Sequence, residues 1–117
     1  MQSVIDRGFL SSGFFFNGAD ASDIVRLTAC LPDRWFVETT IDQREPEKPR
    51  VWIHPAPSYS HHGMSFGLRK GRRMTFVVVE EHASGYRHLE QPYADVRDAF
   101  DGIQRWIQHM AAKRQRS

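Results

Sequence analysis

The chain has 117 residues, of which 40% are hydrophobic and 12% aromatic, and its formal net charge is +2. This size fits one domain, and the apolar fraction can supply a hydrophobic core, which excludes disorder over most of the length. The charge balance is too small to indicate a nucleic-acid-binding protein by itself. We therefore expect a single domain over residues 1–117, with a basic tail at 112–117 that frays.

The chain contains one cysteine, Cys30. It can form neither an internal disulfide nor an all-cysteine zinc site, which is typical of a reducing compartment, and we expect it to be a small core residue. The N-terminus has an early acidic residue and no long apolar run, unlike a signal peptide. No stretch approaches the roughly 20 apolar residues needed to cross a bilayer. We expect a cytoplasmic protein without membrane contacts.

The first third of the chain predicts one short helix. Residues 8–18 are aromatic and bounded by glycines, and they fit either a short strand or a buried loop. The next residues predict a helix that Asp20 caps and Pro32 ends. One side of this helix collects the apolar positions Ile24, Leu27, Thr28 and Leu31.

Two strands are expected next. Residues 34–42 alternate and are rich in β-branched and aromatic side chains, which favours a strand. Residues 50–54 predict a second strand, and the proline-containing segment 54–63 predicts an ordered loop without regular structure. One face of the first strand would carry Trp35, Val37, Thr39 and Ile41, with Phe36 on the other, and the second strand would separate Trp52 from Val51 and Ile53.

Residues 63–81 predict a β-hairpin that turns about Gly71. A three-residue loop at 69–71 would place Gly71 in the left-handed conformation that such a loop needs. This register sets Leu68 opposite Arg72, Phe66 opposite Met74 and Met64 opposite Phe76, so that the large apolar residues share one face.

The last third predicts a turn at 82–85, a short strand at 86–90 and a long helix. Pro92 suits the first position of that helix. Gly102 costs the helix about 1 kcal/mol relative to alanine, which packing should outweigh. The apolar stripe consists of Val96, Phe100, Ile103, Ile107 and Met110, with Trp106 beside it. We predict an α+β fold: an antiparallel meander sheet of four to five strands, with the short N-terminal and long C-terminal helices packed on one face.

Helices on one face would leave Phe36 and Trp52 on the other. An exposed aromatic patch is typical of a partner surface. Our leading hypothesis is a small, non-enzymatic binding or accessory protein, of inhibitor or immunity type or a homodimer. It would contact a protein partner or its own copy through these two residues.

A second hypothesis is nucleic-acid binding through the tip of the hairpin. Basic side chains at such a tip can contact phosphates, although charges there also keep strand edges from associating. The residues concerned are Arg69, Lys70, Arg72 and Arg73.

A third hypothesis is a metal-dependent enzyme that uses loop histidines. The candidate ligands are His61, His62 and His82, with Glu80 near them, but the chain lacks the spacings typical of zinc sites. It also lacks a nucleophile elbow and a phosphate-cradling glycine loop. We therefore favour a non-enzymatic role and expect no bound cofactor.

Overall fold

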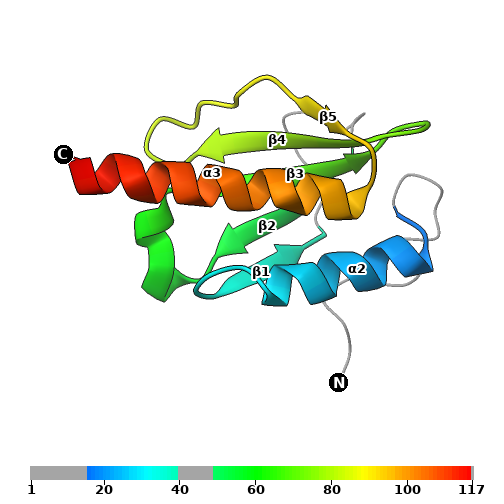
Figure 1. Ribbon diagram of the computed structural model, residues 1–117, viewed down its shortest axis with the longest axis horizontal. Coiled ribbons are helices and arrows are strands. Elements are labelled where there is room, and N and C mark those ends of the chain that lie inside the picture. The colour runs from blue at the N-terminus through cyan, green and yellow to red at the C-terminus, as the bar shows by residue number, and fades with distance from the viewer. Residues whose placement is uncertain (1–15, 40–48, 117) are drawn as a thin grey trace.

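Five antiparallel strands form one sheet, and both helices lie across the same face of it (Figure 1). The computed structural model describes residues 16–39 and 49–116. The strands neighbour one another in chain order, which confirms the predicted α+β meander with a short first helix and a long last helix. The elements are α2 (Gly18–Ala29), β1 (Trp35–Glu38), β2 (Val51–Pro55), the 3₁₀ helix η1 (Pro57–His62), β3 (Met64–Lys70), β4 (Thr75–Glu81), β5 (Gln91–Tyr93) and α3 (Val96–Arg116).

Helix α2 is capped by Asn17, whose side-chain oxygen accepts a hydrogen bond from the Asp20 N–H at 2.8 Å. The prediction that Asp20 caps this helix was wrong, because Asp20 already lies in its first turn. The helix ends at Ala29, ahead of Pro32 as expected. Cys30 follows as an exposed C-cap residue, so its assignment to the core was also wrong.

Helix α3 begins after a reciprocal pair of side-chain caps. The Asp95 carboxylate accepts from the Asp98 N–H at 2.8 Å, and the Asp98 carboxylate accepts from the Ala94 N–H at 3.1 Å. These bonds satisfy backbone donors that the first helical turn leaves free. Pro92 does not start the helix; it lies in the edge strand β5, where a missing N–H is tolerated. Among the described residues, no helix is long and apolar enough to span a membrane.

The apolar stripe of α3 packs on the sheet as predicted. Its glycine has a specific neighbour, because the phenol of Tyr93 occupies the place where a Cβ of Gly102 would lie. The helix-facing core unites Val37, Val51, Ile53, Phe66, Leu68, Val77 and Val79 of the sheet with Val96, Phe100, Ile103 and Ile107 of α3 and Ile24 of α2.

Strands β3 and β4 pair as a hairpin, but the predicted register was wrong. Phe66 pairs with Val79, not with Met74. The turn spans residues 71–74 and is closed by a hydrogen bond from the Gly71 N–H to the Met74 carbonyl at 2.8 Å. Positive φ angles at described glycines occur at other positions, so the left-handed Gly71 was also wrong. Glycine is needed there because the Phe76 ring lies where its Cβ would be.

The register error reverses the two faces of β4. Val77 and Val79 point to the helices, whereas Phe76 and Val78 point to the opposite face together with Ser65 and Gly67. The prediction that Met74 and Phe76 share a face with Met64, Phe66 and Leu68 was therefore wrong. We call this second surface, on which Phe36, Trp52, His54, Ser65, Gly67 and Val78 lie, the open face.

Three further segments differ from or agree with their predicted structure. Residues 57–62 form η1 where an irregular loop was expected, and the turn at 82–85 is confirmed. No strand covers 86–90; a single bridge joins Arg87 to Glu80, and the edge strand follows at 91–93. Residues 8–15 and 40–42, on which other predictions fall, lie outside the described residues.

Candidate functional site

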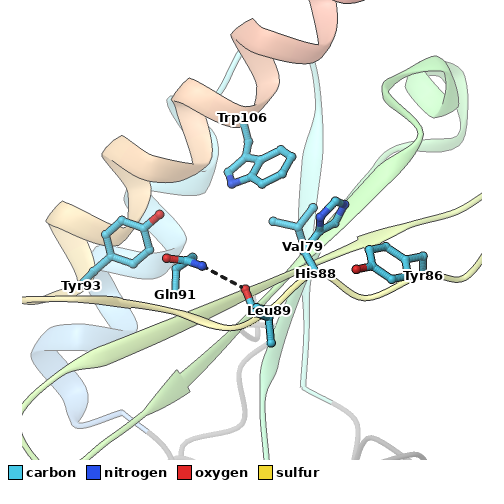
Figure 2. A pocket seen from close by; sticks show the side chains of 7 residues that line it. All are labelled: Val79, Tyr86, His88, Leu89, Gln91, Tyr93 and Trp106. Atoms are coloured by element: carbon cyan, nitrogen blue, oxygen red, sulfur yellow. Dashed lines mark hydrogen bonds between the residues drawn. The ribbon is translucent and has the colours of Figure 1, made fainter.

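A pocket of about 500 Å³ lies between α3 and the segment that follows β4 (Figure 2). This segment leaves the sheet at a turn containing Gly85, returns through the Arg87 bridge and continues into β5. The His88 N–H donates to the Val79 carbonyl at 2.9 Å, which holds the segment beside β4. The pocket is lined by Val79, Tyr86, His88, Leu89, Gln91, Tyr93 and Trp106.

Four of the residues that line this pocket carry aromatic rings, namely Tyr86, His88, Tyr93 and Trp106. The His88 ring lies 5.0 Å from the Trp106 ring and 4.9 Å from the Tyr86 ring, centroid to centroid. A hydrogen bond of 2.6 Å joins His88 Nε2 to the Glu81 carboxylate and orients the imidazole. The walls are about equally polar and apolar, and the volume falls in the range that is usual for ligand pockets.

Two of the lining residues also reach far into solvent. Leu89 is 84% exposed and Tyr86 is 57% exposed. In Figure 2 the Leu89 side chain points away from Trp106, on the outer side of the segment. An exposed leucine alone is ordinary, but Leu89 also lines the pocket beside several aromatic residues.

The open face differs from the exposed aromatic patch that the sequence predicts. Phe36 is 45% exposed, but Trp52 is only 5% exposed. The Arg87 guanidinium lies 4.9 Å from the centre of the Trp52 ring. The His54 ring stacks on Trp52, with 6.1 Å between the ring centres. The indole also lies over Gly67, where an added Cβ would be about 3.0 Å from its ring atoms. The expectation that Trp52 is exposed was therefore wrong.

A chain of hydrogen bonds crosses the open face from β1 to the end of β4. Glu38 Oε1 lies 2.9 Å from His54 Nε2, and His54 Nδ1 lies 2.7 Å from Ser65 Oγ. Ser65 Oγ lies 2.7 Å from His82 Nε2. Burial and the charge of His54 lower the pKa of His82, although Glu80 opposes the shift.

These residue types are those of a serine hydrolase triad, but the geometry does not suit one. Ser65 is 1% exposed, and its hydroxyl lies between two imidazoles. A nucleophilic serine needs an open approach for the substrate carbonyl and a place for the developing oxyanion. We interpret the chain as a structural polar network.

The four basic residues of the predicted hairpin tip have different environments. Arg69 donates to the Glu90 carboxylate at 2.6 Å and lies 4.5 Å from the Phe76 ring centre. Lys70 forms an ion pair with Asp20 at 3.2 Å. Burial would raise the pKa of Glu90, but hydrogen bonds from Arg69 and Arg50 outweigh it and lower the pKa. Arg72 and Arg73 are exposed in the turn itself.

The three predicted metal ligands do not converge. His82 lies on the open face with Ser65, whereas His61 and His62 lie on η1 at the other side of the sheet. His62 instead approaches Asp33, with 2.8 Å between Nε2 and Oδ2. Asp33 was not predicted because it is far from the histidines in sequence, and only the fold brings it close.

The pocket was not predicted from the sequence as a binding site. Residues 86–93 have no regular period, so their apolar side chains could be assigned to no face. The available signal was an excess of large side chains, Tyr86, Leu89 and Tyr93, in a segment too irregular to bury them all. No protein-family model, curated protein or solved structure was found to match this chain.

Proposed function

We propose that this is a small, non-enzymatic protein-binding module that receives an aromatic or branched aliphatic side chain of a partner protein in the pocket between α3 and residues 86–93. The single observation that carries the proposal is that two large exposed residues, Tyr86 and Leu89, also line the pocket. Interfaces are typically built from a buried anchor in a pocket and a surrounding contact surface.

The exposed rim favours a protein over a small molecule as the ligand. A compound that filled about 500 Å³ would cover the inner walls, formed by Trp106 and His88, but would leave Leu89 in water. A protein surface can cover the outer side of the segment as well as the hollow. Aromatic residues are enriched at such interfaces, which agrees with the composition of the walls.

Binding to nucleic acid remains the alternative, supported by exposed Arg72 and Arg73. It is less well supported because Arg69 and Lys70 already form ion pairs with carboxylates. Salt-sensitive binding to an oligonucleotide that Arg72→Ala weakens would favour it.

The test uses pocket variants with a matched surface control. A peptide display library is selected on the wild-type protein, and the selected peptides are measured against Leu89→Ser, Tyr86→Ser and Val25→Ser. Val25 is 43% exposed on α2, so its variant removes an exposed apolar side chain elsewhere. We expect peptides with an aromatic or aliphatic anchor whose affinity falls at least about tenfold in the two pocket variants and is unchanged in the control.

Two readings complete the test. Binding should shift the indole N–H resonance of Trp106 in an NMR titration, and light scattering should separate a partner complex from self-association of the chain. Selected peptides that bind all three variants equally, or that leave Trp106 unshifted, would overturn the proposal.

A further inference from the structure

We infer that Asp33, His61 and His62 form a binding site for a divalent transition-metal ion of the zinc type. One ligand atom from each residue lies within 4.8 Å of the ligand atoms of the other two. Two imidazole nitrogens and one carboxylate oxygen are ligands that Zn²⁺ accepts, with a fourth position left for water or a partner group. The site lies apart from the pocket of the proposed function and does not depend on it.

The turn between α2 and β1 holds Asp33 in place from both sides. The indole N–H of Trp35 donates to the Pro32 carbonyl at 2.8 Å, and the Ala56 N–H donates to the Arg34 carbonyl at 2.8 Å. Asp33 itself has a φ of 68°, a left-handed conformation in which aspartate is better tolerated than most residues. The backbone position of Asp33 is therefore set by the fold, whereas its exposed carboxylate can adjust.

Both histidines come from η1, and their rings lie against each other. His62 is 5% exposed and packs against Trp35, with 5.0 Å between the ring centres. The His61 ring stacks on His62 at 4.7 Å but is exposed, which leaves the site open to an ion from solvent. The site thus combines one fixed, buried imidazole with two exposed ligands that can adjust.

A modest rearrangement would complete the coordination. Bonds of about 2.0–2.1 Å in a tetrahedral site separate neighbouring ligand atoms by roughly 3.3 Å. The 2.8 Å between His62 Nε2 and Asp33 Oδ2 would have to lengthen by about half an ångström, which the exposed Asp33 side chain allows. The ligand nitrogen of His61, which is exposed and lies within 4.8 Å of both atoms, would have to reach the same separation from them. A metal ion would replace the proton that now joins these two atoms.

The surroundings of His62 Nδ1 limit the affinity that we expect for the metal ion. His62 Nδ1 is buried without a hydrogen-bond partner, so a proton there would be unsatisfied. Metal bound at Nε2 moves the ring proton to Nδ1, where no acceptor supports it. Loss of the hydrogen-bond partner of a metal-binding histidine lowers the metal affinity of a site by about 10- to 100-fold. We therefore expect a dissociation constant on the order of micromolar, weaker than that of structural zinc sites.

The experiment titrates tag-free protein with ZnCl₂ by calorimetry and with CoCl₂ by visible absorption. We expect one ion per chain, a four-coordinate Co²⁺ spectrum and a rise in melting temperature with added Zn²⁺. Asp33→Asn keeps a residue that tolerates the left-handed backbone and removes the charge, and His61→Ala removes an exposed ligand. Each should weaken binding at least about tenfold.

His109→Ala is the matched control, since His109 is an exposed histidine on α3 outside the site. Circular dichroism verifies that each variant is folded. Absence of Zn²⁺ binding by the wild-type protein would overturn the inference. So would binding that survives both Asp33→Asn and His61→Ala, or that is lost in His109→Ala.

Discussion

The helix-covered face of the sheet is held by hydrocarbon packing, whereas the open face is held by polar contacts over aromatic rings. On the covered face, Phe66, Ile53 and Val79 are buried against α2 and α3. On the open face, Ser65 is equally buried, but by hydrogen bonds to His54 and His82. The comparison teaches that burial alone does not identify a hydrophobic core, because strand β3 supplies both the buried Phe66 on one face and the buried, hydrogen-bonded Ser65 on the other. The following variants test that difference, beginning with the largest expected effect.

Phe66→Ala should be the most damaging change. The ring is fully buried and lies 5.7 Å from the Trp35 ring, so its removal leaves a cavity between sheet and helices. We expect the free energy of unfolding to fall by about 3–5 kcal/mol. Urea denaturation measures this, and a loss below about 1 kcal/mol would contradict the packing described for this face.

Ser65→Ala tests the open face at the neighbouring residue. The change leaves His54 Nδ1 and His82 Nε2 without the hydroxyl that now lies between them. Unpaired polar groups in a partly buried position should cost about 1–3 kcal/mol of unfolding free energy, less than the cavity on the other face. Ser58→Ala, at an exposed position on η1, is the control and should have no measurable effect. Equal stability of the two variants would mean that the network contributes nothing.

The dependence of stability on pH should come from the open face. Because the pKa of folded His82 is lowered, the unfolded chain binds a proton at this residue more readily. This contribution is complete above the ordinary histidine pKa of about 6.5 and is lost as the pH falls through the lower pKa of the folded protein. The lowered pKa of Glu90 acts only in a more acidic range.

Urea denaturation between about pH 8 and pH 5 therefore measures the contribution of His82 to the free energy of unfolding. The wild-type protein should lose stability across this interval, and His82→Gln should flatten the curve. An unchanged slope in the variant would assign the dependence to other groups.

Phe36→Ser should have the smallest effect on stability. The side chain is 45% exposed at the edge strand, so we expect a change within about 0.5 kcal/mol. Any partner that docks on the open face would nevertheless bind the variant more weakly, as measured by calorimetry. Trp52→Ala cannot make this distinction, because the indole is buried and its loss lowers stability as well.

The two faces also differ in how far the sequence could predict them. Alternation in β1 and β2 assigned Val37 and Ile53 correctly to the covered face and Phe36 to the other. Strand β4 carries apolar residues on both sides, so alternation gives no preferred face, and the predicted register was off by an odd number of residues. Local pattern is sufficient where one side of a strand is polar and fails where both sides are apolar.

The candidate sites depend on contacts that no local pattern contains. Ser65, His54 and Glu38 meet because three strands lie side by side, and Asp33 reaches His62 across 29 positions in the chain. The pocket needs Trp106 of α3 opposite a segment without periodicity. Residue types suggested metal binding only for His61 and His62, and in each case the fold supplied the neighbours.

The contact between Tyr93 and Gly102 has a consequence for the partner binding proposed above. A displacement of α3 by one helical turn would bring Asp98 or Trp106 against the phenol in place of the glycine, so only one longitudinal alignment of helix and edge strand avoids a steric clash. Tyr93 and Trp106, which both line the hollow, are thereby kept at a constant spacing. A partner side chain would enter a cavity that is already formed in the free protein. Binding would then cost little conformational entropy of the pocket and would require no slow rearrangement before association.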